Sequence, residues 1–223
     1  MTAFPFAIVG FDLDGTLLDT HADLGEALNH ALTRAGRSPV PTSAVRDLIG
    51  GGARLMLERG LAMTGGPLPE DEVRALHREL IAHYRENIAV HTALFPGGAA
   101  MLDALEERGA RLAVVTNKLE SLAVRLLDEL GLSARLATII GGDTLGPGRS
   151  KPEPDLLHEM VRRLGGGRAA YVGDTTFDTG AARAAGLPCV AVSFGFNDVP
   201  VDALGADAVI DHYDELVPAL ERL

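Results

Sequence analysis

The stretch "FAIVGFDLDGTLLDT", residues 6–20, joins a run of six apolar residues to the acids Asp12 and Asp14. An apolar run without polar alternation is typical of a strand that is buried on both faces of a parallel sheet. Two carboxylates at the end of such a strand cost several kcal/mol unless another group compensates their charge. The stretch therefore predicts a buried strand that ends in a charged site, with the compensating charge supplied from elsewhere.

The same pattern of short apolar runs, separated by helical stretches, continues from about residue 111 to the end of the chain. The predicted strands lie in "RLAVVTN" at 111–117, "ATIIGGD" at 137–143, "AAYVGDT" at 169–175, "PCVAVSF" at 188–194 and "DAVID" at 207–211. Strands that are joined through helices pair in parallel and have helices on both faces of the sheet. We therefore expect an α/β fold with a doubly wound parallel sheet, similar to a Rossmann core.

Between the first strand and Phe95 this alternation stops. Apolar positions recur with helical spacing in residues 24–32, a short capped helix is predicted at 42–50, and residues 70–88 form a long amphipathic helix. No strand is predicted in this segment. We expect an inserted helical cap at residues 17–93, an α/β core formed by residues 1–16 and 94–223, and hinges near residues 17–20 and 92–98.

The composition limits the classes of partner. The chain has 223 residues, a net charge of −11 and an isoelectric point near 5.0. This charge disfavours nucleic acid and anionic membranes as partners, because both attract clustered positive charge. The N-terminal residues show no leader, no apolar run is long enough to span a bilayer, and the single cysteine, Cys189, lies in an apolar stretch. We therefore expect a soluble cytoplasmic protein, in which an anionic small substrate would need local positive charge at its site.

Polar side chains collect where the predicted strands end, which is the edge at which doubly wound sheets bind ligands. These residues are Asp12, Asp14, Thr116, Asn117, Asp174 and Asp178, and Lys151 precedes a helix that begins near Pro152. Of the 20 basic residues only Lys118 and Lys151 are lysines. Carboxylate and carbonyl oxygens without imidazole or thiolate favour Mg²⁺, which is often shared with a substrate phosphate. The pattern indicates a magnesium-dependent site for a phosphoryl group, with Lys151 supplying further positive charge.

Asp12 and Asp14 have different expected tasks at this site. Phosphate monoesters hydrolyse very slowly without catalysis, and two steps through an aspartyl-phosphate are one route around that barrier. Because alternate residues of a strand face opposite sides, Asp14 reaches the side of Asp12 while Leu13 turns into the core. We expect Asp12 to be the nucleophile and Asp14 to be the acid/base.

Four motifs, in this order, resemble those of the haloacid dehalogenase superfamily of phosphohydrolases. They are "DLDGT" at 12–16, "TN" at 116–117, "KPEP" at 151–154 and "GDTTFD" at 173–178. The resemblance covers essentially the whole chain, and the helical insertion is similar to the small cap of that superfamily. It implies that Asp12 and Asp174 ligate Mg²⁺ and that Asp14 adds its main-chain carbonyl. It further implies that Thr116 and Asn117 hold phosphate, that Lys151 neutralises and orients it, and that Asp178 supports the metal and Lys151.

Particular residues favour phosphate-ester hydrolysis within that superfamily. The presence of Asp14 disfavours dehalogenation, and the absence of lysine between residues 17 and 93 disfavours phosphonoacetaldehyde hydrolases, which use a Schiff-base lysine in the cap. Thr16 is similar to the hydrolytic members rather than to β-phosphoglucomutases, although mutase-like phosphotransfer stays an alternative. A non-catalytic phosphate-binding protein is expected to lack Asp12 or Asp14, and both are present.

The start of the insertion resembles that of phosphoglycolate phosphatases, in "LLDTHADLGEALNHALTRAG" at 17–36 and "LIGGGARLMLERGL" at 48–61. Glycines at 50–52 let the backbone approach a small substrate, and Arg54 is a candidate to bind its carboxylate. Thr16 and Asn117 are the other candidate substrate contacts. We expect 2-phosphoglycolate as the substrate, with another small phosphate, such as a sugar phosphate, pyrophosphate or a nucleotide, as the alternative. Lys118 and His21, beside the motifs, receive no role, and no oligomeric state is predicted.

Overall fold

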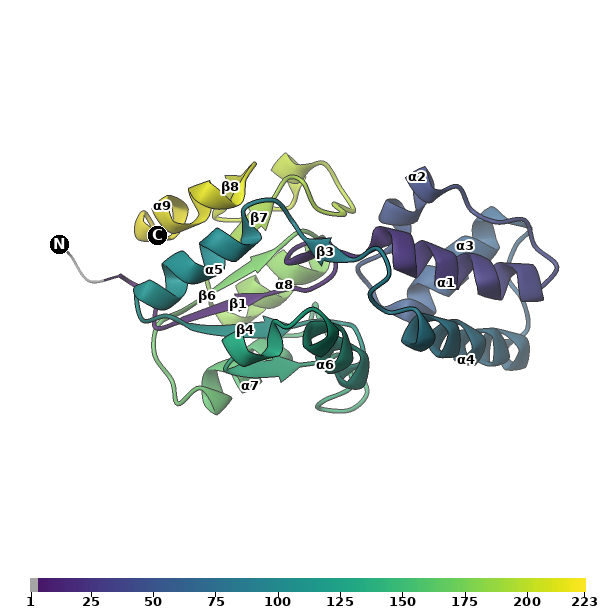
Figure 1. The fold of residues 1–223 in the computed structure, drawn as a ribbon, viewed down its shortest axis with the longest axis horizontal. Coiled ribbons are helices and arrows are strands. Elements are labelled where there is room, and N and C mark those ends of the chain that lie inside the picture. Colours follow the sequence, from purple (N-terminus) through teal and green to yellow (C-terminus); the bar gives the residue numbers. More distant parts are fainter. Residues whose placement is uncertain (1–3) are drawn as a thin grey trace.

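The computed structural model describes residues 4–223, so the first three residues of the predicted core lie outside the described part. Its centre is a six-stranded sheet in the order β5-β4-β1-β6-β7-β8, and every neighbouring pair is parallel (Figure 1). The strands are β1 (Ile8–Phe11), β4 (Arg111–Val115), β5 (Thr138–Ile140), β6 (Ala169–Gly173), β7 (Cys189–Val192) and β8 (Ala208–Ile210). The predicted doubly wound parallel sheet is confirmed.

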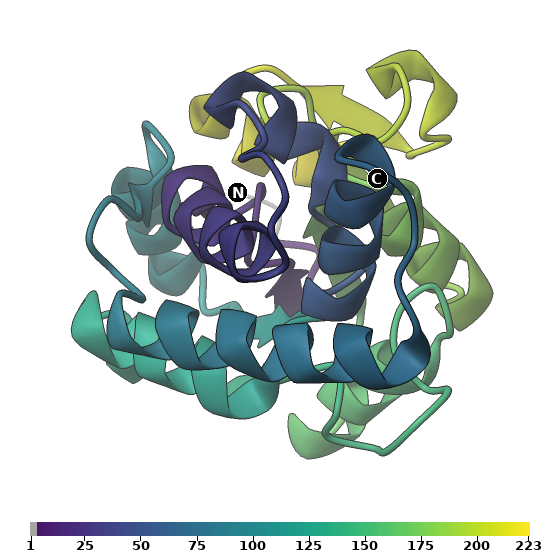
Figure 2. The ribbon, with the colours of Figure 1, turned by 90° about the vertical axis from the view of Figure 1, so that its right-hand side faces the viewer.

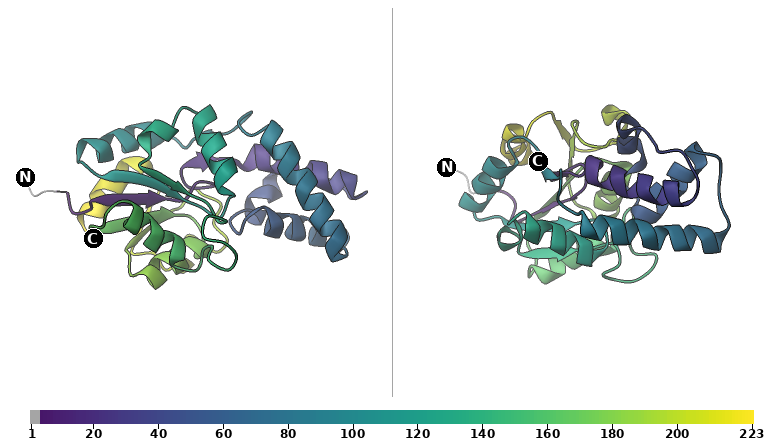
Figure 3. Two further views of the ribbon diagram at one scale, coloured as in Figure 1. Left: turned by 90° about the horizontal axis from the view of Figure 1, so that it is seen from below. Right: turned by 45° about the vertical axis from the view of Figure 1, so that its right-hand side comes forward.

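Helices cover both faces of this sheet, as Figure 3 shows from below. They are α5 (Gly98–Glu107), α6 (Glu120–Glu129), α7 (Asp155–Arg163), α8 (Thr176–Ala185) and α9 (Leu216–Glu221), with short 3-10 turns η2 (Ser133–Arg135), η3 (Val201–Ala203) and η4 (Tyr213–Glu215). Ile8 packs with buried residues of α7 and α8, whereas the next residue, Val9, packs with those of α5, α6 and α9. Alternate strand residues thus serve opposite layers, which explains the continuous apolar runs in the sequence.

A second group of helices follows β1 and lies beyond one end of the sheet (Figures 1 and 2). It contains α1 (His21–Arg34), α2 (Thr42–Val45), η1 (Arg46–Leu48), α3 (Ala53–Met63) and α4 (Glu70–Glu86). Leu28, Leu57 and Leu80 are among its buried apolar side chains. We call this group the helical segment, and its use as a cap with boundaries at 17 and 93 stays a prediction.

A two-stranded ribbon connects the helical segment to the sheet domain. β2 (Leu18–Asp19) pairs antiparallel with β3 (Ala93–Leu94), with Leu18 opposite Leu94. The sequence analysis predicted hinges here and no strand. Two residues are too few to show the alternation by which a strand is recognised, so this pairing is visible only in three dimensions.

A buried acid, Asp23, fixes the two connections to each other. Its carboxylate accepts hydrogen bonds from the backbone N–H groups of His91 and Thr92 at 3.0 Å and from Thr92 Oγ1 at 2.7 Å. Asp23 lies in the first turn of α1, and Thr92 lies just before β3. The chain therefore enters and leaves the helical segment at one point.

The order of the strands creates the binding edge. From β1 the chain goes to β4 and β5 on one side and then crosses to β6 on the other, so Phe11 lies between Val114 and Val172. Open α/β sheets bind ligands at such a switch point, outside the carboxyl ends of the strands. The residue after Phe11 is Asp12, so the first motif lies at that point. Within residues 4–223, no helix combines the length and apolar character that crossing a membrane requires.

Candidate active site

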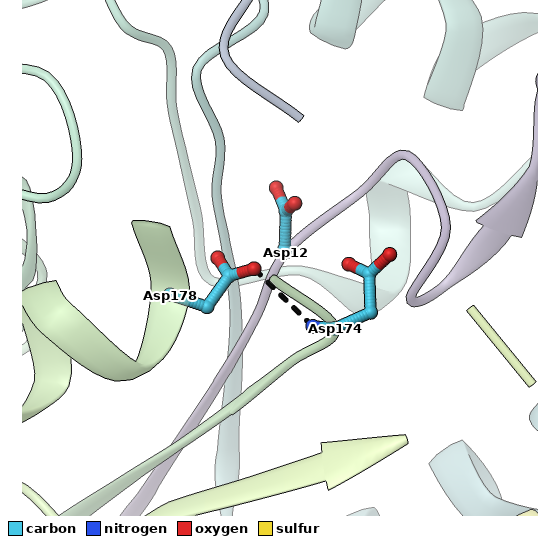
Figure 4. A group of neighbouring side chains, drawn as sticks. All are labelled: Asp12, Asp174 and Asp178. Atoms are coloured by element: carbon cyan, nitrogen blue, oxygen red, sulfur yellow. Dashed lines mark hydrogen bonds between the residues drawn. The ribbon is translucent and has the colours of Figure 1, made fainter. Parts of the chain in front are cut away.

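Three buried carboxylates meet at the switch point. Asp12 follows β1, Asp174 follows β6, and Asp178 lies in the first turn of α8. One oxygen from each lies within 4.8 Å of the others. Figure 4 shows the three side chains gathered at one point, with Asp12 from the end of β1 and with Asp174 and Asp178 from the segment that joins β6 to the first turn of α8. The sequence brings three negative charges into a place where water cannot screen them.

Lys151 supplies positive charge to this cluster. Its Nζ lies 2.9 Å from Asp12 Oδ1 in an ion pair, and it donates hydrogen bonds to Asp178 Oδ1 at 2.6 Å and to Tyr171 Oη at 2.9 Å. Burial alone would lower the pKa of Lys151, but the attraction of Asp12 and Asp178 outweighs burial and raises that pKa. Lys151 therefore remains a cation beside these carboxylates.

Asp178 is held in place by the turn that begins α8. Its Oδ2 accepts hydrogen bonds from the backbone N–H of Thr175 at 2.9 Å and from the Thr175 hydroxyl at 2.7 Å, which forms a capping box. A side chain at Gly173 would place its Cβ 2.3 Å from the Cβ of Asp178, so the close approach of strand and helix requires glycine. Burial acts to raise the pKa of Asp178, yet Lys151 lowers that pKa below its ordinary value.

Asp174 is oriented by neighbours on both sides. Thr16 Oγ1 donates to Asp174 Oδ1 at 2.8 Å, and the backbone N–H of Phe196 donates to Oδ2 at 2.7 Å. Burial, reinforced by the charges of Asp178 and Asp12, raises the pKa of Asp174 well above its ordinary value. The carboxylate is thus rigidly placed but short of positive charge.

Asp12 is also short of positive charge. Burial, opposed by Lys151 and reinforced by Asp178 and Asp14, raises the pKa of Asp12 to about 6. Its Oδ1 has the ion pair with Lys151 but accepts no hydrogen bond from any residue in the described range 4–223. Three carboxylates against one ammonium leave a deficit of positive charge that a divalent cation removes. Because all the donors are hard oxygens, the residues fit Mg²⁺.

Asp14 is paired with Lys118, the lysine to which the sequence gave no role. Lys118 Nζ donates to the two oxygens of Asp14 at 2.8 Å and 2.9 Å and lies 4.5 Å from the ring centre of Tyr84. Both members of the pair are buried. Asp14 therefore belongs to a second ion pair, separate from the three-acid cluster. The scarcity of lysine was the signal that could have identified Lys118.

A cavity of about 260 Å³ is lined by Asp12 and Asp14 but not by Lys151, Asp174 or Asp178. The core contributes Asp12, Asp14 and residues 116–118, and the helical segment contributes residues 49–54, His77 and Tyr84. The cavity therefore lies between the end of the sheet and the helical segment. A space of this size suits a small ligand whose charged end reaches the carboxylates.

Thr116 and Asn117 line the cavity, and they also hold the backbone around it. Thr116 Oγ1 accepts from the backbone N–H of Lys118 at 3.2 Å. Asn117 Nδ2 donates to the carbonyl of Lys151 at 3.1 Å and to that of Gly50 at 3.3 Å. The second of these bonds joins the core directly to the helical segment.

Three other residues have side-chain partners that the sequence did not indicate. Thr16, a candidate substrate contact, donates its hydroxyl to Asp174 and is absent from the described residues that line the cavity. Arg54 lines the cavity, but its guanidinium pairs with Glu58 at 2.5 Å and Glu70 at 2.6 Å. His21 Nδ1 lies 2.5 Å from Asp19 Oδ1. These side-chain partners depend on the tertiary structure, so the sequence pattern does not reveal them.

Comparisons with known proteins show which family this chain resembles in sequence. The haloacid dehalogenase-like hydrolase family matches residues 9–192. Phosphoglycolate phosphatase from Agrobacterium fabrum is 43% identical over 97% of this chain and 92% of the relative. Phosphoglycolate phosphatase from Caulobacter vibrioides is 44% identical over 93% of this chain and 87% of the relative.

Solved structures show the same architecture. One, described as a "predicted phosphoglycolate phosphatase" from Haemophilus somnus 129PT, matches with a TM-score of 0.89 and 29% identity, over 98% of each chain. Another, CbbY from Rhodobacter sphaeroides in complex with phosphate, matches with a TM-score of 0.81 and 25% identity, over 97% of this chain and 99% of the other. The match therefore includes the helical segment as well as the sheet.

Proposed function

The chain belongs to the haloacid dehalogenase-like hydrolase family, and from this premise we propose that it hydrolyses 2-phosphoglycolate to glycolate and phosphate. The protein is a phosphatase, as are the relatives that match nearly its whole length. The observation that carries the proposal is the position of Asp12, whose buried Oδ1 lies beside Lys151 and whose side chain lines the cavity.

Asp12 is the proposed nucleophile. Its carboxylate attacks phosphorus and the bond from phosphorus to the ester oxygen breaks, which leaves an aspartyl-phosphate. Asp14, the proposed acid/base, takes up a proton from solvent, gives it to the departing oxygen and then takes one from the water that attacks the aspartyl-phosphate. Phosphate leaves, Asp14 returns that proton to solvent, and both carboxyl groups are again in their first state.

Lys151, Thr116 and Asn117 are proposed to hold the phosphoryl group. Lys151 is already fixed beside Asp12 by Asp178 and Tyr171, so little reorganisation is needed when phosphate arrives. Thr116 and Asn117 line the cavity on the same side. A preorganised cation beside the reacting group stabilises the charge that develops during transfer.

Asp12, Asp174 and Asp178, with the main-chain carbonyl of Asp14, are the proposed ligands of Mg²⁺. When bound, Mg²⁺ supplies positive charge to the phosphoryl oxygens and makes phosphorus more electrophilic. Thr16 is proposed to orient Asp174 rather than to contact substrate, because its hydroxyl already donates to that carboxylate.

The helical segment is proposed to act as a cap, with residues 17–93 covering a core of residues 1–16 and 94–223. Its residues form one wall of a cavity whose size suits a two-carbon phosphate ester. The ion pairs of Arg54 with Glu58 and Glu70 would have to break before this arginine could bind a substrate carboxylate. A cytoplasmic location and a small phosphorylated metabolite as the partner complete the proposal.

Phosphate release from a panel of monoesters tests this function. We expect turnover that needs Mg²⁺, falls by orders of magnitude in Asp12→Asn, and has its highest kcat/KM with 2-phosphoglycolate. The panel includes hexose phosphates, pyrophosphate and nucleotides. A strong preference for hexose phosphates would contradict the substrate assignment, and normal turnover by Asp12→Asn would contradict the mechanism.

A further inference from the structure

Lys118 is a buried cation at the cavity, and the proposed hydrolysis steps give it no task. The exposed fraction of its side chain is 5%, and its ammonium touches two described groups, the carboxylate of Asp14 and the ring of Tyr84. Lysine is almost never buried unless it is paired. A chain that uses arginine for 18 of its 20 basic residues has a lysine at this position and at Lys151.

Lys118 is paired with Asp14, the proposed acid/base of the reaction. Lys118 donates to both oxygens of Asp14, at 2.8 Å and 2.9 Å. An acid/base whose two oxygens are occupied by an ammonium must be released before it can give a proton to a leaving oxygen. A second anion, brought next to Asp14 by the substrate, would pair with the ammonium of Lys118 and so release Asp14.

The chemistry of the proposed substrate places such an anion at the right position. In 2-phosphoglycolate the carboxylate is attached to the carbon that carries the ester oxygen. When that oxygen lies beside Asp14, the carboxylate is only two bonds further away, and Lys118 Nζ is within 3 Å of Asp14. One small molecule can therefore reach both groups.

Tyr84 offers a second donor at the same place. Its hydroxyl is buried, it has no hydrogen-bond partner among residues 4–223, and the residue lines the cavity. Burial, opposed by the nearby charge of Lys118, raises the pKa of Tyr84 to about 12, so the hydroxyl keeps its proton at neutral pH. A buried hydroxyl without a partner costs free energy that an incoming acceptor recovers. Lys118 comes from the loop after β4 and Tyr84 from α4, so the two donors lie on opposite walls.

We propose that Lys118 and Tyr84 form a carboxylate-binding subsite that selects phosphate monoesters with a carboxylate next to the ester carbon. This inference rests on the proposed function and names the residues that give it specificity. The ammonium binds one carboxylate oxygen, the tyrosine hydroxyl donates to the other, and Asp14 is released toward the leaving oxygen. Arg54, which is held by two glutamates, is not required for this selection.

The test compares two substrates that differ in the carboxylate, 2-phosphoglycolate and ethyl phosphate, by the ratio of their kcat/KM values. We expect a wild-type ratio well above one. Lys118→Met keeps the length of the side chain and removes its charge, and we expect it to lower the ratio at least about tenfold, the usual effect of losing a charge-assisted hydrogen bond. The ratio cancels effects that are common to both substrates, such as a change in the resting position of Asp14, and it keeps the effect that depends on the substrate carboxylate.

Tyr84→Phe removes only the hydroxyl and keeps the folded packing, so it tests the subsite even if Lys118→Met folds poorly. We expect it to lower the ratio by about three- to tenfold. Arg125→Met is the matched control, since it removes an exposed cation on α6 that pairs with Glu129. We expect this variant to keep the wild-type ratio.

The outcomes separate this inference from the function on which it rests. A wild-type ratio near one would overturn the substrate assignment itself. A high wild-type ratio that neither Lys118→Met nor Tyr84→Phe changes would overturn the subsite alone. In that case equal losses on both substrates in Lys118→Met would mean that Lys118 only positions Asp14.

Discussion

Lys151 Nζ lies 2.9 Å from Oδ1 of Asp12, and both side chains are almost completely buried. The contact joins the segment after β1 to the segment before α7, and no other described cation lies in the three-acid cluster of Asp12, Asp174 and Asp178. Removing one partner of a buried ion pair leaves a charge that water cannot stabilise. Much of the stability of the site, as well as its activity, therefore depends on Lys151.

Lys151→Met should lower the free energy of unfolding by about 3 kcal/mol or more, measured by urea denaturation at pH 7 without metal. The substitution should also reduce kcat/KM, and the reduction should be the same for every phosphate ester. The reason is that Lys151 is proposed to bind the phosphoryl group, which all the esters share. Arg125→Met, which removes an exposed cation on α6 outside the cluster, serves as the comparison. A Lys151→Met protein with wild-type stability would show that the carboxylates carry no net charge.

Mg²⁺ should stabilise the protein against heat. The three carboxylates have one ammonium between them, and a ligand that binds only the folded state adds about 2.7 kcal/mol when present at 100 times its dissociation constant. We expect Tm to rise with MgCl₂ and to return after EDTA is added, by differential scanning calorimetry. In Asp174→Asn the rise should be much smaller. An equal rise in both proteins would place the binding elsewhere.

Asp23→Ala should loosen the junction between the helical segment and the sheet. The backbone N–H groups of His91 and Thr92 and the Thr92 hydroxyl lose their common acceptor, at an expected cost of about 2 kcal/mol in unfolding free energy. Hydrogen exchange at the amides of residues 91 and 92 should become faster. Glu26→Ala, in the same helix, removes only an exposed pair with His91 and should cost less than about 0.5 kcal/mol.

Cys189 should lower stability at alkaline pH. Burial, with a smaller contribution from Asp178, raises the pKa of the Cys189 thiol far above its ordinary value. The folded thiol stays protonated, whereas the unfolded thiol ionises above about pH 8.5, so its contribution to stability is complete below that pH and is lost as pH rises. Relative to Cys189→Ala, the wild type should lose about 2 kcal/mol between pH 8 and pH 10.

A chemical probe checks the same point. We expect a thiol reagent such as DTNB to leave the native protein unmodified and to react at once in concentrated guanidinium chloride. Rapid reaction of the native protein at pH 8 would mean that the thiol is accessible and ionised.

Particular residues show what could be predicted from the sequence. The apolar run before Asp12 and the acids after it predicted β1 and its charged end, because burial on both faces and ligand binding at strand ends leave local patterns. The pairing of β2 with β3 leaves none, since it involves two residues on each side. The contacts of Lys118 with Asp14 and Tyr84 join three distant segments, and the donation of Thr16 to Asp174 depends on a side-chain rotation. Such contacts follow from the fold, so a linear pattern does not contain them.

The most direct test of the account is to detect the phosphoryl group on Asp12. The enzyme is mixed with 2-phosphoglycolate and Mg²⁺, quenched in acid during turnover, digested with pepsin at low pH and measured by mass spectrometry. We predict that the peptide containing Asp12 gains the mass of one phosphoryl group. In Asp12→Asn the corresponding peptide should gain no such mass, and the variant should show no turnover. Turnover at the wild-type rate by Asp12→Asn, or a phosphoryl group on another residue, would contradict the account.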